Sequence, residues 1–343
     1  NLRSEGRIGG ATDTHSQSNS AGTEEFLQVM LKRWCWNRFR ISNGGSPCSM
    51  GSSVGNSPTR LGGMSVLPYY VWNESENDWI TFESMSIVDL KNDASSKKEK
   101  GRKTHVKEIS IYTQNVWFNS LFKEERSERL MRSFQENIHS DIFCLQEVTA
   151  SLLEYIKADA YIRENYVMTN VDTTVHPRNC WYGVLMLIRK GDFKGLQYRL
   201  PMVESHQGRD LLVHVTRINS QLVAFSTIHL ESCVENSEYR LQQLRTIFQH
   251  FRELRDDYGI HHAFLMGDMN FDPKDEEQKE LTKLFHTIDS WLYLHPSIPG
   301  YTEDPERNIF RKGQQQRRYD RIFVVPLNEE VDKSCKKEKE GSS

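Results

Sequence analysis

The sequence predicts an α/β protein, a four-layer sandwich in which two packed mixed sheets are flanked by helices. Short apolar runs of strand length recur along the chain, and several of them alternate apolar and polar residues with period two. Between these runs lie helical patterns, with apolar residues three or four positions apart. Many strands with interspersed helices are typical of two sheets that pack on each other and are covered by helices.

The composition is that of a globular protein of 343 residues, with 37% hydrophobic and 27% charged residues. The apolar run at residues 183–188 is among the longest and is far below the roughly 18 residues of a membrane helix, so we expect no membrane partner. The net charge of -3 excludes a uniformly basic protein, so nucleic acid could bind only at local patches. Six cysteines without a CxxC pair argue against a zinc module and favour a reducing compartment.

Residues 1–104 are predicted to be a largely flexible N-terminal extension. Few apolar side chains occur in residues 1–24, and 14 of the 23 residues in 41–63 are Gly, Ser or Pro, as in a linker. Residues 66–90 regain aromatic side chains and are predicted to form a small element. The basic run at residues 97–107 fits either a solvated linker or a nucleic-acid contact.

The main domain is predicted to span residues 105–327, followed by a charged tail at 328–343. Its expected strands lie at residues 109–113, 141–145, 183–188, 211–218, 222–228, 263–266 and 321–325. One helix is marked by apolar residues at every fourth position, namely Leu130, Phe134 and Ile138. A second follows a candidate N-cap at Ser237 and carries an apolar stripe made of Leu241, Leu244, Phe248 and Phe251.

Polar side chains stand where four of these strands end. Asn115 follows the first strand, Gln146 and Glu147 the second, His229 the fifth, and the sixth runs into Gly267, Asp268 and Asn270. A single carboxylate or imidazole at a strand end is usually a turn, cap or structural residue. Four such ends in one chain supply the groups needed to hydrolyse a phosphate ester with a hard cation.

These residues resemble the motifs of the endonuclease/exonuclease/phosphatase superfamily of metal-dependent phosphodiesterases, over roughly residues 109–325. Three longer stretches are similar to its tyrosyl-DNA phosphodiesterase subfamily: Asn115 to Phe118, Leu145 to Thr149, and Thr227 to Ser232. The resemblance implies a DNA-repair hydrolase that cleaves the 5′-phosphotyrosyl bond between DNA and a trapped, topoisomerase-type protein. It implies DNA 5′ ends with linked tyrosine or peptide as the partner. It also implies the nucleus as the location, with the cytoplasm as an additional candidate.

The resemblance also assigns roles to the strand-end residues. Glu147 is the predicted ligand of Mg²⁺, with Mn²⁺ as the alternative ion, because such a cation binds few protein oxygens and keeps several waters. Asp268 is the predicted general base, and Asn270 is expected to hold the attacking water or a phosphoryl oxygen. His229 would donate to a non-bridging oxygen, and Asn115 would lie near Glu147 and the phosphate.

The predicted substrate-binding residues are Trp181, Tyr182, Arg209, Arg240, Phe271 and Asp320. Trp181 and Tyr182 fall where the subfamily has an aromatic that stacks on terminal bases, with an aromatic cap on the core as the alternative. Arg209 and Arg240 are candidates for contacts with backbone phosphates. The basic surplus at residues 307–321 fits either a phosphate-facing loop or a solvated one.

The sequence departs from the superfamily pattern after residues 318–323, because the superfamily's final Ser-Asp-His motif does not follow. We therefore expect the sequence of the main domain to be incomplete at its C-terminal end. Two alternative functions stay open: another nuclease or deadenylase of the superfamily, and a weakened or non-catalytic form that binds DNA ends.

Overall fold

The computed structural model describes residues 42–43, 65–96, 106–107, 109–136, 138–172, 182–191, 195–203, 205–218, 221–308, 310 and 313–327. The residues outside this description include 1–41 of the predicted flexible extension, most of the predicted linker at 41–63, most of the basic run at 97–107 and the tail at 328–343. Within the described part of the chain, no helix is long and apolar enough to cross a membrane.

One sheet has seven strands in the order β14-β15-β13-β12-β11-β10-β2. Its strands are β2 (Ser65–Leu67), β10 (Gly195–Pro201), β11 (Asp210–Ile218), β12 (Gln221–His229), β13 (Ile260–Asp268), β14 (Ile288–Asp289) and β15 (Asp320–Pro326). β12 and β13 run parallel, and the other neighbours pair antiparallel. The sheet is therefore mixed, and β12 and β13 end at the same edge.

The second sheet has six strands in the order β4-β3-β8-β9-β7-β6. They are β3 (Tyr69–Asn73), β4 (Asp78–Phe82), β6 (Ile111–Asn115), β7 (Ile142–Thr149), β8 (Tyr166–Met168) and β9 (Tyr182–Arg189), with only β6 and β7 parallel. A separate pair joins β1 (Ser42–Asn43) to β5 (Val106–Lys107).

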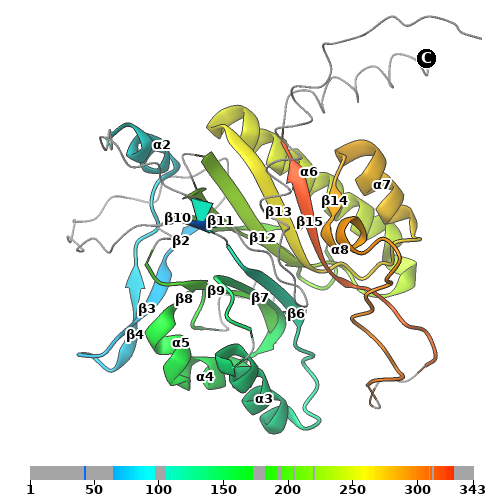
Figure 1. Cartoon of the computed structure of the whole chain (residues 1–343), viewed down its shortest axis with the longest axis horizontal. Helices are drawn as coiled ribbons and strands as arrows, with labels where there is room; N and C mark the ends of the chain where they lie inside the picture. The colour runs from blue at the N-terminus through cyan, green and yellow to red at the C-terminus, as the bar shows by residue number, and fades with distance from the viewer. Residues whose placement is uncertain are drawn as a thin grey trace, which may run out of the picture.

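Helices cover the outer faces of both sheets (Figure 1). α3 (Lys123–Glu136), α4 (Ala150–Ala158) and α5 (Ala160–Asn165) lie on the six-stranded sheet. α6 (Ser237–Tyr258), α7 (Glu276–Phe285) and α2 (Ile87–Ser96) lie on the seven-stranded sheet. The 3₁₀ helix η3 (Val234–Asn236) leads into α6, and α8 (Ser290–Leu294) packs beside β15. The predicted four-layer α/β sandwich is confirmed.

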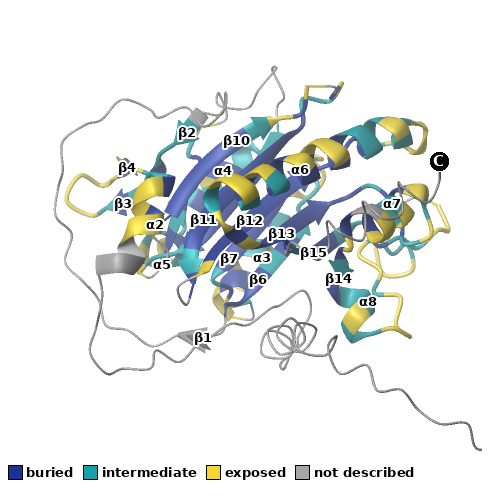
Figure 2. Cartoon of the chain, turned by 90° about the horizontal axis from the view of Figure 1, so that it is seen from above, coloured by how far each residue is buried: buried dark blue, intermediate teal, exposed yellow. Residues whose placement is uncertain are grey.

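Side-chain alternation along the strands produces three apolar layers. Along β11, Leu211, Val213 and Val215 face the helix α6, while Leu212 faces the other sheet. The same alternation sends the side chain of Cys144 from β7 into the layer between the sheets. The buried strands form the centre of the molecule in Figure 2. This packing holds the ends of β6, β7, β12 and β13 in fixed positions.

The segment predicted as a small element at 66–90 is built into both sheets. β2 pairs with β10, and the hairpin of β3 and β4 extends the six-stranded sheet through β8. Trp72 and Trp79 pack edge to face across that hairpin, with ring centroids 5.9 Å apart, and both are 8% exposed. Because these aromatics are buried against the domain, the segment extends its core.

Candidate active site

The polar strand ends meet at one edge of the sandwich. His229 is the last residue of β12 and pairs with Asp268 at the end of β13, which in turn pairs with Asp320 at the start of β15. From the other sheet, Asn115 at the end of β6 pairs with Gln146 of β7. The two sheets thus bring the predicted residues together around a cavity of about 540 Å³.

Glu147 enters this cavity because β7 is irregular there. The pairing of β7 with β9 shifts register between Leu145 and Val148, and Glu147 has a φ of 63°. A bulge of this kind re-aims a side chain that regular alternation would send elsewhere. The neighbouring Gln146 is fully buried, and its amide donates to Thr113 and to Thr227 of the opposite sheet, at 3.1 and 3.0 Å.

Gly267 allows β13 to approach β12 closely enough to place Asp268. Its φ is 130°, and a β-carbon built on it would lie 1.9 Å from the carbonyl oxygen of Ile228. Residues other than glycine rarely adopt this conformation, and that carbonyl belongs to the neighbouring strand. The close approach sets Asp268 beside His229.

Gly267→Ala is therefore expected to lower the free energy of unfolding by about 3 kcal/mol or more, through combined strain and overpacking. Urea unfolding followed by circular dichroism measures the loss. The control is Gly259→Ala after α6, where φ is 69° and nothing lies within 4 Å of the added carbon. That control should cost only about 1 kcal/mol, and equal losses for the two variants would contradict the steric explanation.

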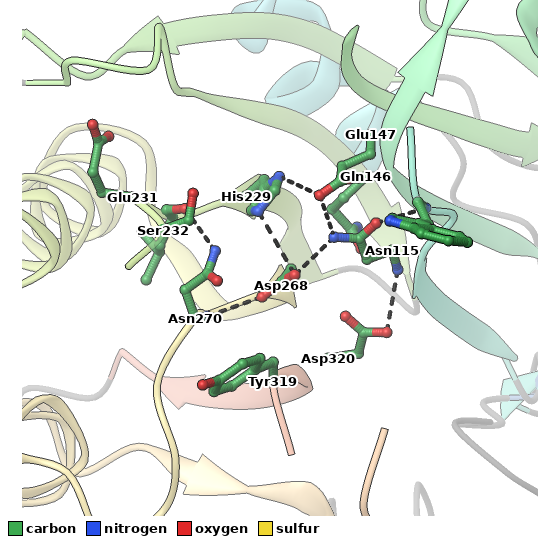
Figure 3. A network of polar contacts seen from close by, with 12 residues as sticks. Asn115, Gln146, Glu147, His229, Glu231, Ser232, Asp268, Asn270, Tyr319 and Asp320 are labelled. Atoms are coloured by element: carbon green, nitrogen blue, oxygen red, sulfur yellow. Dashed lines mark hydrogen bonds and ion pairs between the residues drawn. The ribbon is translucent and has the colours of Figure 1, made fainter. Parts of the chain in front are cut away.

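The amide of Asn115 joins the two sheets at the centre of the site (Figure 3). Its Nδ2 donates to Glu147 Oε1 at 2.9 Å and to Asp268 Oδ2 at 2.8 Å. Its backbone N–H donates to Asp320 Oδ2 at 3.2 Å. The other oxygen of Glu147 accepts from the backbone N–H of Phe118 at 2.7 Å. One asparagine therefore orients three carboxylates.

His229 is held as a neutral imidazole. Arg209 Nη1 lies 3.0 Å from His229 Nδ1 and Nη2 lies 3.4 Å from Nε2. Because a guanidinium only donates and the contact at Nδ1 is the shorter, we assign Nδ1 as the acceptor and the proton to Nε2. That Nε2 lies 3.6 Å from Asp268 Oδ2. Burial, together with the charge of Arg209, lowers the pKa of His229 well below its usual value. The imidazole is thus a hydrogen-bond donor with no charge of its own.

The loop that carries Arg209 is fastened by Glu231, a residue to which the sequence analysis assigned no role. Glu231 is fully buried and accepts from the hydroxyl of Ser205 at 2.7 Å and from the backbone N–H groups of His206 and Gln207 at 2.9 Å. Gln207 in turn accepts from Arg209 Nη2 at 2.7 Å. Glu231 thus acts on the site only by fixing the loop.

The three carboxyl groups that accept hydrogen bonds from Asn115 have raised pKa values. For Glu147 and Asp268, burial is the largest cause, and the hydrogen bonds from Asn115 act in the opposite direction. For Asp320, burial and then the charge of Asp268 raise the pKa well above its usual value. Nearby protein groups therefore stabilise the negative charge of these carboxylates only in part. A bound cation would supply the missing stabilisation.

The residues of this site could hold a hard divalent cation through a single carboxylate. Among the described residues, no three His, Cys, Asp or Glu side chains are grouped so as to enclose a metal ion. Mg²⁺ commonly binds through one or two carboxylates and completes its shell with waters and substrate phosphate. Glu147, anchored by Asn115 and Phe118 at the edge of the cavity, is the residue that would hold it.

Because folding raises the pKa of these carboxyl groups, the folded chain binds protons more tightly than the unfolded chain does. The contribution of these three groups to the free energy of unfolding should thus fall as the pH rises above about 4, the range of unfolded carboxyl groups. At pH 7.5, Mg²⁺ at 100 times its dissociation constant should restore about 2.7 kcal/mol. Thermal unfolding in Mg²⁺ and in EDTA checks this expectation. Glu147→Gln should lose the shift, and identical curves for the wild-type chain would contradict it.

Tyr182 lines the cavity and stacks flat on Phe118, with ring centroids 4.9 Å apart and planes 4° from parallel. Arg209 lies over the Tyr182 ring at 5.7 Å. Its predicted stacking on DNA bases stays a prediction, and Trp181 lies outside the described residues. Phe118, which the sequence reasoning named only as part of a motif, supports both Tyr182 and Glu147.

Arg240 and Phe271 are placed in the interior. Arg240 is 3% exposed and donates to Glu277 at 2.7 Å and to the carbonyl oxygens of Glu231 and Cys233 at 3.0 and 2.6 Å. Phe271 is fully buried beneath the guanidinium of Arg321, 5.0 Å from its ring. Neither lines the cavity, and their substrate contacts stay predictions.

The fold and this site define a class of protein. The sequence model of the Endonuclease/Exonuclease/phosphatase family matches residues 112–337, about two thirds of the chain. The chain belongs to this family. The family resemblance found in the sequence is thus confirmed.

Within that class the chain is similar to tyrosyl-DNA phosphodiesterase 2. It is 30% identical to the Rattus norvegicus protein over 189 residues, which cover 53% of this chain and 48% of the relative. For the Xenopus laevis protein the values are 29% over 188 residues, 53% and 47%. The chain spans about half the length of these relatives.

Two solved structures share the fold. One is TDP2 from C. elegans, with a TM-score of 0.54 and 22% identity, covering 64% of each chain. The other is TDP2 from D. rerio complexed with single strand DNA product, with a TM-score of 0.54 and 24% identity, covering 64% of this chain and 84% of that one. At this level of identity, both comparisons support the fold alone.

Proposed function

We propose that this chain is a DNA-repair phosphodiesterase that hydrolyses the 5′-phosphotyrosyl bond between DNA and a trapped protein. The observation that carries the proposal is the amide of Asn115 set between Glu147 and Asp268, beside the neutral imidazole of His229. Family membership supports the hydrolysis of phosphate esters. Similarity to tyrosyl-DNA phosphodiesterase 2 supports the tyrosyl bond as the target.

In this proposal Asp268 accepts the proton of the attacking water. Its raised pKa makes it a stronger base than an exposed aspartate. The backbone N–H of Asn270 donates to Asp268 Oδ1 at 2.9 Å and keeps the carboxylate oriented. His229 donates from Nε2 to a non-bridging oxygen as negative charge grows in the transition state.

The leaving group departs on the side of Glu147. Glu147 and Asp268 flank the amide of Asn115, so a phosphate seated over that amide has the base on one side and Glu147 on the other. Mg²⁺ held by Glu147 would supply Lewis-acid stabilisation of the phosphate and of the departing oxygen. A tyrosyl phenolate, with a pKa of about 10, leaves more readily than an alkoxide.

The proposed partner is a DNA 5′ end bearing tyrosine or a peptide. The D. rerio relative solved with single strand DNA product supports a DNA end as the substrate. A DNA substrate favours action in the nucleus, with the cytoplasm as an additional candidate location. Imaging of the tagged chain in cells tests that location, and a chain excluded from nuclei would contradict it.

Turnover of a 5′-phosphotyrosyl oligonucleotide, with Mg²⁺ and with EDTA, tests the function. We expect release of free tyrosine and a 5′-phosphate only with Mg²⁺. Faster cleavage of polyadenylate or of plain RNA would favour the alternative of a nuclease or deadenylase. Tight binding of the oligonucleotide without any turnover would favour the alternative of a non-catalytic DNA-end binder.

Replacing Trp181 and Tyr182 together by Ala should raise the KM for the DNA substrate by about 5- to 100-fold, the value of one base–aromatic stack. The KM for a small p-nitrophenyl phosphodiester should change much less. Tyr293→Ala, which removes a 48% exposed tyrosine from α8, is the control. Equal increases in KM for both substrates would show that the aromatic pair supports the core of the domain and does not stack on DNA bases.

A further inference from the structure

A second cavity, of about 690 Å³, adjoins the catalytic one. It lies between α3, the first turn of α4 and the outer end of β6, and we name it the α3 cavity. Trp117, Phe118 and Glu147 line both cavities, so they form a shared wall. Asp268 lines only the catalytic cavity. The α3 cavity therefore opens on the Glu147 side of the reacting phosphate, away from the attacking water.

Arg126 in this cavity has hydrogen-bond donors without an acceptor. Its Nε and Nη1 are buried and have no hydrogen-bond partner among the residues that the structure describes, while Nη2 donates to the carbonyl oxygen of Asn119. The guanidinium is positioned over the ring of Trp117, 4.6 Å from its centre. Buried donors are nearly always satisfied, and leaving one unsatisfied costs about 1–3 kcal/mol. Arg126 lines the cavity, so an acceptor that enters it could satisfy these donors once the guanidinium turns toward the open space.

The positive charge of the residues that line the α3 cavity favours an acceptor that is negatively charged. Lys123 and Arg129 join Arg126 in the lining, and Glu147 is the one acidic side chain among the described residues that line it. Glu147 is already committed to Asn115 and Phe118. Apolar lining comes from Tyr112 and Leu130. A ligand that combines an anionic group with apolar surface matches these walls.

We propose that the α3 cavity receives the peptide that carries the adduct tyrosine, and that Arg126, with Lys123 and Arg129, selects peptides with an acidic residue beside that tyrosine. This inference rests on the proposed function, in which the bond to tyrosine breaks on the side of Glu147. Water attacks opposite the departing oxygen, so whatever is attached to that oxygen extends away from Asp268 and toward the α3 cavity. In a tyrosyl adduct the attached group is peptide.

The test compares three substrates with the same oligonucleotide, whose 5′-linked tyrosine is free, flanked by Glu, or flanked by Gln. We expect kcat/KM to be about tenfold higher with Glu than with Gln, the value of one charge-assisted contact of about 1.4 kcal/mol. In Arg126→Met this ratio should fall to about one, whatever the absolute rate. Arg132→Met removes an exposed cation from the same helix outside the cavity and should keep the ratio.

A readout without turnover separates this proposal from the proposed function. A fluorescein-labelled peptide with Glu beside tyrosine should bind the wild-type chain and Arg132→Met, and should bind Arg126→Met at least tenfold more weakly, as measured by anisotropy. Absence of turnover for all three substrates would overturn the proposed function. Turnover with equal kcat/KM for Glu and Gln would overturn the cavity proposal alone. Binding of an unmodified oligonucleotide that Arg126→Met loses and Arg132→Met keeps would assign the cavity to nucleic acid and overturn it too.

Discussion

Glu147→Gln should reduce Mg²⁺-dependent turnover of the phosphotyrosyl oligonucleotide by about 10²–10³-fold, while the fold and DNA binding persist. Gln has the same shape, so one oxygen can still accept from the amide of Asn115 or the N–H of Phe118. What the variant lacks is the negative charge that would hold the cation. Single-turnover rates across a Mg²⁺ titration measure the loss, and circular dichroism checks the fold.

Glu136→Gln, at the exposed end of α3, is the matched control for this variant. It removes one carboxylate from the surface and should leave the rate and its Mg²⁺ dependence unchanged. Wild-type turnover by Glu147→Gln at every Mg²⁺ concentration would contradict the assignment of this ligand.

Asp268→Asn should reduce kcat by about 10²–10⁴-fold, the usual contribution of a positioned general base. The asparagine can still accept from the N–H of Asn270, but its amide donors would face those of Asn115, where the aspartate accepts at 2.8 Å. The rate of the wild-type enzyme should also fall at acidic pH. Because burial raises the pKa of Asp268, that fall should begin at a higher pH than for an exposed aspartate.

Rate profiles from pH 4 to pH 9 check the second variant. Asp257→Asn, an exposed aspartate near the end of α6, should reproduce the wild-type profile. Asp268→Asn should lack the acidic limb that belongs to Asp268. A variant that kept both the rate and the limb would show that another group accepts the proton.

The predicted strands could be located because their patterns are local. All seven predicted segments lie in or overlap strands of the structure, with β7 extending to Thr149 and β13 beginning at Ile260. β10 was missed because Gln197 and Arg199 interrupt its apolar residues. Arg199 is nevertheless buried, since Asp210 and the carbonyl oxygen of Val184 accept from it at 2.6 and 3.0 Å.

The site residues were predictable to the extent that they sit at strand ends. Asn115, Glu147, His229, Asp268 and Asn270 all line one cavity. The sequence could not show that Arg240 is neutralised by Glu277, because these residues are 37 positions apart and are joined only by the packing of α6 on α7. The N-terminal cap of α6 differs as well: the helix begins at Ser237, and Asn236 precedes it as the cap.

The α3 cavity could not be predicted from the sequence either, because it is also formed by tertiary packing. Its cations lie on a helix whose charges alternate in sign, as on any solvated helix. Arg126 differs from Arg132 on the same helix because a turn of the chain places the ring of Trp117 beneath its guanidinium. Trp117 has a φ of 59°, and its N–H donates to Asn115 Oδ1 at 2.8 Å. The same asparagine thus shapes both cavities.

Because Asn115 is hydrogen-bonded to a carboxylate on each sheet, the geometry of the catalytic centre depends on how the two sheets are aligned. Glu147 belongs to one sheet and Asp268 to the other, and a single amide nitrogen spans them. A misplacement of about 1 Å can cost 10²-fold in rate. Slippage between the layers, as from a smaller residue at Phe225 or Phe264, would thus silence the enzyme while its secondary structure stayed intact. Activity in this protein should fail before the fold does.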